Sequence, residues 1–365
     1  MEEEFESIEK LAERIKKKPV LERVTRALNK ENKVIALYAF NSTGKTRLSS
    51  EFVDVEEEGV KTLRYSAFFE DIFVWDNENY ILKCDPNSWI IKRIVDQGLE
   101  SKIIDNFRDI TRFNIEPNFD FVKGDITFKI ASGDDESLDG IKISRGEESI
   151  FVWSVFYSLL EEAIDTLNDS KENRTTEIFN DLKWIIIDDP VSSMDDTKIV
   201  TIAVKLAEKV KSFNNNSVDF LITTHHALFF NVLFNSFKKK KKYFESYILI
   251  KDDGVFKLSR QNDSPFGYHL LLKETIKNAI ISNGIEKYHF NLFRSLLEKT
   301  SSFLGYEDWT KCLSDDIKEG IKKLLQLYSH DRLSDLEPRQ LSSEEKDLFV
   351  QAFNAFTAKY FHDAK

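Results

Sequence analysis

Residues 185–196 of this chain, IIIDDPVSSMDD, constrain its fold more than any other segment. A short run of β-branched apolar residues is typical of a strand that is buried on both faces, as strands of parallel sheets are. The run ends in two adjacent acids, Asp188 and Asp189, and a turn rich in serine and aspartate follows. In sheets of this kind, ligands bind beyond the carboxyl ends of the strands. The segment therefore predicts a central strand that delivers two carboxylates to a ligand site.

Three further segments accompany it, in the order that an ABC-type ATPase requires. Residues 39–46 read AFNSTGKT, which matches a phosphate-binding loop except that Ala39 stands where the first glycine is usual. Residues 143–147 read ISRGE, a variant of the signature sequence of these ATPases, and residues 221–226 read LITTHH, a strand followed by histidines. Because such strands alternate with helical patterns, we expect an α/β ABC-type P-loop ATPase domain.

The phosphate-binding loop is expected to bind a nucleoside triphosphate through its backbone. A loop that leads into a helix N-terminus directs N–H groups at the β-phosphate, Lys45 would bridge the β- and γ-phosphates, and Thr46 would offer its hydroxyl to Mg²⁺. The predicted nucleotide-binding residues of the loop are Asn41, Ser42, Thr43, Gly44, Lys45 and Thr46.

The two acids have separate expected roles. Asp188 is predicted to hold the water shell of Mg²⁺, and Asp189 to polarise the attacking water. Most ABC ATPases carry glutamate at the second position, so we hypothesise that hydrolysis is slow and serves as a switch. His225 resembles the histidine that senses the γ-phosphate, and residues 192–195 resemble a loop that reaches a partner subunit.

The segment ISRGE places a serine and a glycine at the start of a helix, where a hydroxyl and a backbone N–H can bind a γ-phosphate. Ser144, Gly146 and Glu147 are therefore predicted to bind nucleotide. In ABC ATPases this segment completes the site of the other protomer, so it predicts a head-to-tail homodimer or higher oligomer. Gln97 is a weak candidate for the glutamine that this class carries in its Q-loop.

Composition excludes several classes of protein. The 365 residues, 41% of them apolar, predict two domains with buried cores. No apolar run approaches the roughly 20 residues of a membrane span, and the charged N-terminus does not resemble a signal peptide, so we expect a cytoplasmic protein without membrane contact. Cys84 and Cys312 show no metal-ligand spacing, which leaves disulfide frameworks and zinc sites unsupported.

The net charge of −11 argues against a surface that binds nucleic acid throughout. One local cluster, the five lysines at 238–242, lies between Phe237 and Tyr243 and suits a nucleic-acid backbone. A solvated loop between two strands is the commoner structure for such a run.

Hydrophobic spacing predicts the elements of the first domain. We expect an amphipathic helix over the first thirty residues, with Phe5, Ile8, Leu11 and Ile15 on its apolar face. Central strands are expected at residues 34–38, 184–187 and 220–223, and helices from 47 and from 149.

The chain changes character near Asp263, which gives an ATPase domain over residues 1–264 and an all-α domain over 265–365. Ser342 and Glu345 have capping-box spacing before the last of four helical patterns. These patterns cover residues 268–283, 285–304, 316–328 and 344–360.

Within the helical region, Arg294 and Glu298 lie one turn apart on one helix face, and His330 follows the next helix. Residues of this kind at i,i+4 usually form a surface ion pair, so the pattern alone does not make them catalytic. The alternative to an enzyme is an ABC-type regulatory or DNA-repair ATPase whose helical domain only binds a partner. The roughly hundred residues between loop and signature show no sustained heptads, which disfavours long coiled-coil repair ATPases.

The chain resembles the PrrC-type family of anticodon nucleases over nearly its whole length. Ala39 and Asp189 depart from the general ABC pattern but agree with this family. The segments that carry the resemblance are YAFNSTGKTRLS, FFEDIFVWDN, ISRGEESIFVWSVFYSLL, IDDPVSSMDD, FFNVLFNSF, EKYHFNLFRSLLEKTSSFLGYEDW and YSH.

The resemblance implies that the ATPase domain controls a helical, HEPN-like ribonuclease domain, which cuts tRNA-Lys in its anticodon loop, 5′ of the wobble base. The family's RxxxE and SH motifs fall on Arg294, Glu298 and His330. These imply cleavage without a metal: Glu298 and His330 transfer protons, in an order left open, and Arg294 holds the phosphate. The implied products carry a 2′,3′-cyclic phosphate and a 5′-OH.

Substrate reading and regulation follow from the same resemblance. Asp263 is the closest match to the acid with which relatives read the modified wobble base, although an ordinary turn aspartate is the alternative. The resemblance implies GTP as the hydrolysed nucleotide and dTTP as a stabilising ligand. It also implies a phage-defence toxin that a type I restriction-modification complex silences until a phage-encoded inhibitor peptide releases it.

Overall fold

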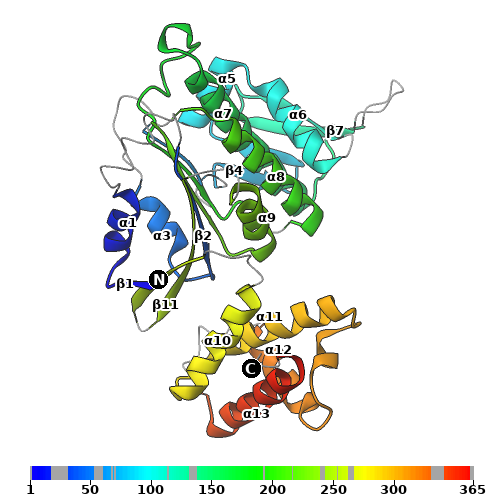
Figure 1. The fold of residues 1–365 in the computed structure, drawn as a ribbon. Helices are drawn as coiled ribbons and strands as arrows, with labels where there is room; N and C mark the ends of the chain where they lie inside the picture. The colour runs from blue at the N-terminus through cyan, green and yellow to red at the C-terminus, as the bar shows by residue number, and fades with distance from the viewer. Residues whose placement is uncertain are drawn as a thin grey trace. The chain divides into compact units, whose positions relative to one another are not determined.

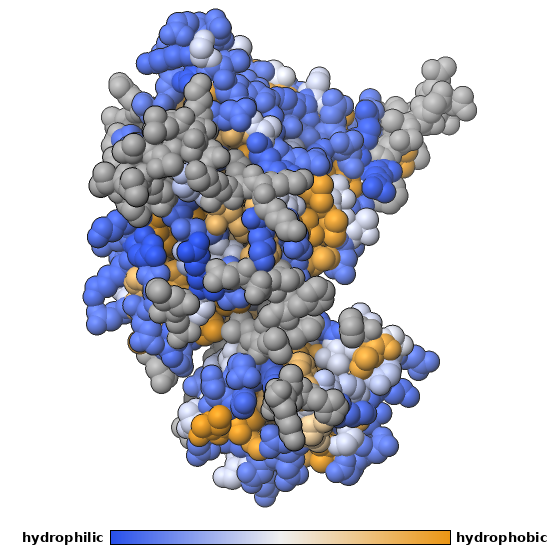
Figure 2. Space-filling view, in the orientation of Figure 1, coloured by the Kyte–Doolittle hydropathy of each residue, from blue (hydrophilic) through white to orange (hydrophobic). Residues whose placement is uncertain are grey.

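The computed structural model divides into two compact units, Met1–Pro265 and Phe266–Lys365, which are described separately here (Figure 1). No helix in the described part of the chain is long and apolar enough to cross a membrane. On the visible face, apolar residues are interspersed with hydrophilic ones in both units (Figure 2). The structure describes residues 2–17, 32–52, 61–66, 69, 71–112, 115–130, 138–191, 194–215, 217–238, 243–252, 254–261, 267–329 and 341–361.

A seven-stranded sheet forms the centre of the first unit. Five adjacent strands, β11 to β3 in the spatial order, run parallel; β12 pairs antiparallel with β11, and the edge strand β1 pairs antiparallel with β12. The carboxyl ends of β2, β10 and β9 therefore meet at one edge. In spatial order the strands are β1 (Glu2–Phe5), β12 (Val255–Arg260), β11 (Phe244–Asp252), β2 (Val34–Ala39), β10 (Asp219–Thr224), β9 (Trp184–Asp188) and β3 (Thr62–Tyr65).

Helices cover both faces of this sheet, as expected for central strands that are apolar on both sides (Figure 1). In β9, Ile186 shares one core with α1 (Ile8–Lys16) and α3 (Lys45–Ser50). Its neighbours Ile185 and Ile187 belong to the core on the other side. The helices of that side are α7 (Arg145–Asn168), α8 (Asp196–Ser212) and α9 (Ala227–Phe237). The three central strands predicted from the sequence are confirmed.

A second, antiparallel sheet in the same unit was not predicted. Its strands are short, and β7 shows the alternation of apolar and polar residues that is typical of a half-buried strand, a signal that the sequence-based prediction did not use. The short η1 (Lys171–Asn173) follows α7. The other elements of this region are β4 (Phe73–Asp76), β5 (Ile81–Cys84), α5 (Trp89–Gln97), α6 (Glu100–Thr111), β6 (Ile115–Asp120), β7 (Asp125–Ile130) and β8 (Leu138–Asp139).

The N-terminus differs from the predicted helix. Phe5 belongs to β1, which pairs with β12, and the helix begins only after Ser7, whose side chain accepts a hydrogen bond from the Lys10 N–H. Ile8, Leu11 and Ile15 are buried along one face of α1, as expected. The error at Phe5 has a physical reason: strand pairing with a distant segment satisfies the backbone there, and helical spacing cannot reveal such a partner.

The elements that the structure describes in the second unit are helices, joined by turns and short extended segments. A cluster of phenylalanines fills its core, with Phe290 and Phe293 of one helix against Phe349 and Phe353 of another. Ser342 and Glu345 form the predicted capping box. The elements are α10 (Gly267–Ile281), α11 (Lys287–Leu304), η2 (Trp309–Cys312), α12 (Lys318–Ser329) and α13 (Ser343–Tyr360).

Phe293→Ala is expected to destabilise the second unit by about 3–5 kcal/mol, because Phe293 is fully buried and its ring contacts three other phenylalanine rings. Denaturant unfolding of the whole chain measures this change. Ile281→Ala is the control, since Ile281 is 73% exposed and its truncation should change stability by less than about 0.5 kcal/mol. Equal effects of the two substitutions would contradict this account of the core.

Candidate functional site

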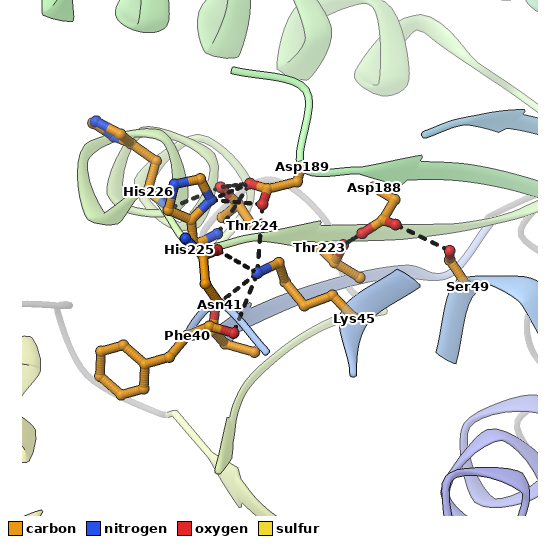
Figure 3. A network of polar contacts seen from close by, with 11 residues as sticks. Phe40, Asn41, Lys45, Ser49, Asp188, Asp189, Thr223, Thr224, His225 and His226 are labelled. Carbon is orange, nitrogen blue, oxygen red and sulfur yellow. Dashed lines mark hydrogen bonds and ion pairs between the residues drawn. The ribbon is translucent and has the colours of Figure 1, made fainter. Parts of the chain in front are cut away.

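The phosphate-binding loop connects β2 to α3, and Lys45 is the first residue of that helix. Ser42 and Gly44 adopt left-handed backbone, with φ of 64° and 104°, which curls the loop tightly. Lys45 Nζ turns back into this curl, 3.2 Å from Asn41 Oδ1 and 3.3 Å from the carbonyl oxygens of Ala39 and Phe40 (Figure 3). The loop thus holds a buried cation among its own acceptors.

Lys45 also forms an ion pair with Asp189, at 3.4 Å. Asp189 lies just beyond β9 with φ +57°, a left-handed conformation that is uncommon for a residue with a side chain. Its N–H donates to Thr223 O (2.9 Å), and its carboxylate accepts from the N–H of His225 (3.2 Å). His225 Nδ1 lies 2.6 Å from the same carboxylate (Figure 3). Contacts from β10 and the loop therefore hold an unusual backbone conformation in place.

Two opposing effects set the charge of Asp189. Burial raises the pKa of its carboxyl, but hydrogen bonds from His225 and the nearby charges of His225 and Lys45 outweigh burial and hold the pKa below its ordinary value. Asp189 is therefore ionised at neutral pH. An ionised carboxylate next to a lysine and a histidine can accept a proton from, or orient, a water molecule.

Asp188, the last residue of β9, is 3% exposed. Ser49 Oγ lies 3.2 Å from one carboxylate oxygen, and Thr223 Oγ1 lies 2.5 Å from the other. In the described part of the chain, no group of three or more His, Cys, Asp or Glu side chains could hold a metal ion. A single oriented carboxylate fits Mg²⁺, which typically takes one or two protein oxygens and completes its shell with phosphate and water.

The signature segment lies at the start of α7, beside the second sheet. Ser144 is the N-cap of this helix: its hydroxyl accepts from the Glu147 N–H (3.3 Å), and its own N–H donates to Glu147 Oε2 (2.6 Å). Gly146 lies in the first turn. A cavity of about 670 Å³ opens at this helix start, and its lining includes Ser144, Arg145 and Trp75.

The nuclease candidates lie in the second unit. Arg294 Nε donates to Glu298 Oε1 at 2.8 Å along α11, and the Arg294 guanidinium lies 5.4 Å from the centre of the Trp309 ring. Arg294 therefore has contacts with both Glu298 and Trp309, and the Glu298 side chain, which is 46% exposed, remains accessible from solvent. His330 follows directly after α12 but lies outside the described residues.

Several other predictions are not tested by this geometry. Gln97 is the last residue of α5 and does not follow a strand of the parallel sheet. The expectation that a strand precedes the lysine run is wrong, because Lys238 is the C-cap of the helix α9. Outside the described residues lie Ser192, Ser193, the lysines at 239–242 and Asp263.

The residues whose side chains contact the predicted site residues and fix their positions were not identified from the sequence. Ser49 and Arg64 contact each other beside Asp188, and Thr223 bonds both Asp188, through its hydroxyl, and Asp189, through its carbonyl oxygen. Ser49 follows Lys45 by four residues on α3, which was a usable signal for its position. The contact of Trp309 with Arg294 joins segments fifteen residues apart and had no such signal.

Residues 99–356 match the family model described as AAA domain. This match covers more than half of the chain. The matched residues include β9, which ends in Asp188, and the neighbouring strand β10, whereas the loop that leads to Lys45 precedes them. The fold and the site define a P-loop ATPase.

Over 344 residues the chain is 40% identical to a protein of Escherichia coli named Anticodon nuclease, and the match covers 86% of each chain. The chain belongs to the anticodon nuclease family, which confirms the resemblance found in the sequence.

Similar solved structures include the SMC head domain from Thermotoga maritima, with 12% identity, a TM-score of 0.32, and 63% of this chain and 90% of that chain covered. Another is an Smc head domain from Pyrococcus furiosus bound to a domain of ScpA, with 12% identity, a TM-score of 0.29, and 50% and 39% covered. Overlaps this loose carry no argument about the function of this chain.

Proposed function

We propose that this protein is an endoribonuclease that cleaves tRNA in the anticodon loop under the control of its ATPase domain. The observation that carries the proposal is the 40% identity to an anticodon nuclease over 86% of the chain. The ion pair of Arg294 and Glu298 on α11 supports it, because a cation and an acid at 2.8 Å supply two of the groups that RNA cleavage needs.

The proposed reaction is an attack of the ribose 2′-OH on the adjacent phosphate. One of Glu298 and His330 takes the 2′-OH proton, and the other gives a proton to the leaving 5′-oxygen. Arg294 neutralises charge on the phosphate while its stacking on Trp309 limits its motion. The products carry a 2′,3′-cyclic phosphate and a 5′-OH. We propose that this HEPN-like helical domain needs no metal for the step.

The proposed substrate is tRNA-Lys, cut 5′ of the wobble base, and the proposed reader of the modified base is Asp263. Family membership supports both assignments. Single-stranded loops suit such a reader because their unstacked bases expose hydrogen-bonding edges.

The ATPase domain is proposed to hydrolyse ATP or GTP, with dTTP as a stabilising ligand. Mg²⁺ would supply charge neutralisation at the β- and γ-phosphates. Lys45 and the loop residues 41–46 would bind the phosphates, Asp188 and Thr46 would hold the metal, and Asp189 would orient water, with His225 fixing its carboxylate. We hypothesise that Asp189, being shorter than glutamate, makes hydrolysis slow enough to act as a timer.

We propose a head-to-tail dimer, or a higher oligomer, in which Ser144, Gly146 and Glu147 complete the nucleotide site of the partner subunit. Support comes from their place at the exposed start of α7, next to a cavity, on elements other than those that carry Lys45 and Asp188.

Ser144→Arg is expected to prevent this closure by steric block, and nucleotide hydrolysis should fall together with nucleotide-dependent dimerisation. Light scattering with and without nucleotide, beside a hydrolysis assay, measures both. Ser149→Arg, on the same helix, tests whether an added arginine elsewhere on α7 is enough to prevent dimerisation. Normal assembly and normal hydrolysis in Ser144→Arg would contradict the composite site.

The proposed setting is the cytoplasm, where a type I restriction-modification complex silences this phage-defence toxin until a phage-encoded inhibitor peptide releases it. The competing proposal is an ABC-type regulatory or DNA-repair ATPase whose helical domain only binds a partner.

One experiment separates the two. The protein is incubated with total tRNA and nucleotide, and new RNA ends are mapped by sequencing with end-group analysis. A cut in the tRNA-Lys anticodon loop supports the nuclease. Intact tRNA under conditions of active nucleotide hydrolysis supports the partner-binding ATPase.

A further inference from the structure

Arg64 reaches the metal side of the nucleotide site from a strand that the motif analysis did not use. It lies in β3, which pairs in parallel with β9, and it is opposite Ile186 in the register. Ile186 belongs to the core beneath α1 and α3, and the Arg64 side chain reaches α3 on that same face. The topology therefore brings a guanidinium to the first turns of α3, next to the carboxylate at the end of β9.

The Arg64 contacts form a short relay. Its Nη2 donates to Ser49 Oγ at 2.7 Å and to the carbonyl oxygen of Thr46 at 3.3 Å. Ser49 Oγ lies 2.9 Å from that same carbonyl oxygen. It also lies 3.2 Å from Asp188 Oδ2, as Figure 3 shows. Arg64 is thus linked to Asp188 indirectly, through the hydroxyl of Ser49.

The Ser49 hydroxyl has one proton and two acceptors within reach. Arg64 Nη2 donates to Ser49 Oγ at 2.7 Å, and both Arg64 and the Ser50 hydroxyl (2.8 Å) donate to the Thr46 carbonyl, so the Ser49 proton can point at Asp188. Without Arg64, the donor that fixes the Ser49 oxygen is lost, the hydroxyl can turn to the nearer Thr46 carbonyl, and Asp188 Oδ2 then loses its donor. Thr223 would then be the one remaining hydroxyl that holds the Asp188 carboxylate among the described contacts.

A second observation suggests that Arg64 is not there for stability. Its Nε is buried and has no hydrogen-bond partner in the described part of the chain. A buried donor without a partner destabilises a fold, so an apolar residue would suit this position better if packing were its only purpose.

We infer that Arg64 is a positioning residue for the metal site, which acts through Ser49 to orient the carboxylate of Asp188. The inference rests on the proposed role of Asp188 in holding Mg²⁺. Groups that orient a metal-binding side chain typically change metal affinity 10- to 100-fold when they are removed.

The test measures metal binding rather than turnover. Mn²⁺ is titrated into the full-length protein with a non-hydrolysable nucleotide, and free Mn²⁺ is followed by electron paramagnetic resonance. Arg64→Met keeps length without donors and should raise the Mn²⁺ dissociation constant about tenfold. Arg64→Lys keeps a cation with donors and should raise it less. Nucleotide binding in EDTA should stay normal in both variants, which shows that the loop is folded.

A double-mutant cycle tests the relay itself. Ser49→Ala should match Arg64→Met, and the double variant should show about the same tenfold change, because both residues act through one hydrogen bond. Arg47→Met is the control, since Arg47 is an exposed arginine of α3 that pairs with Glu9. Independent effects that multiply to about a hundredfold would overturn the relay.

The variant Asp188→Asn distinguishes a failure of the inference about Arg64 from a failure of the proposed metal site. If Asp188→Asn weakens Mn²⁺ binding and Arg64→Met does not, the inference about Arg64 is wrong and the metal site stands. If Asp188→Asn leaves Mn²⁺ binding unchanged, the proposed metal site is wrong, and the inference falls with it.

Discussion

RNA cleavage is expected to disappear in each of the variants Arg294→Ala, Glu298→Gln and His330→Ala. Loss of one proton-transfer group costs about 10²–10⁴ in rate, and loss of Arg294 also breaks the 2.8 Å ion pair that fixes Glu298. Nucleotide hydrolysis should stay near normal, because these residues belong to the second unit. A labelled anticodon stem-loop of tRNA-Lys, with end-group analysis, measures the cut.

The control for this series is Glu319→Gln, which makes the same chemical change at an exposed glutamate of α12. The three losses should not add in combined variants, since the groups act on one reaction step. Cleavage by the activated enzyme should persist in EDTA. Products with 3′-OH and 5′-phosphate ends, or full activity in His330→Ala, would refute the mechanism.

Nucleotide hydrolysis is expected to fail in two distinguishable ways. Lys45→Ala removes the buried cation of the loop and should abolish detectable nucleotide binding. Asp189→Asn keeps the shape of the side chain but removes its charge, so the variant should bind nucleotide and hydrolyse it about 10²–10⁴-fold more slowly. Binding of a fluorescent nucleotide and steady-state phosphate release measure the two effects.

Asp96→Asn is the matched control for the second variant, because Asp96 is an exposed aspartate of α5 that pairs with Arg93. An unchanged rate of hydrolysis in Asp189→Asn would show that the Asp189 carboxylate does not activate water, and binding retained in Lys45→Ala would contradict the role of the loop.

The sequence was sufficient for the central strands and for the position of the acids, because a strand buried on both faces leaves a local apolar run that ends at its functional residues. The approach of Lys45 to Asp189 was not accessible in this way. It depends on β2, β10 and β9 being neighbours in the sheet, although they come from distant parts of the chain. The left-handed backbone of Asp189 had no sequence signal.

Some structural features had a clear sequence signal that the sequence-based predictions did not use. Ser144 and Glu147 have the spacing of a capping box, and the structure contains that box. The position of Arg64 near the site had no local sequence signal, because its contact with Ser49 depends on the pairing of β3 with β9. Local patterns thus predicted the ends of elements, whereas contacts across the sheet required its topology.

The backbone conformation at Asp189 bears on which acid can stand at this position. With φ at +57°, this position favours aspartate or asparagine, whose short polar side chains can bond to nearby backbone groups in the left-handed region. Glutamate at this position would extend the carboxylate further from the backbone, but its backbone would have to adopt the left-handed conformation, which glutamate rarely occupies. The identity of the acid is therefore coupled to the bend of the chain, and Asp189→Glu would change the reach of the carboxylate and strain the backbone at the same time.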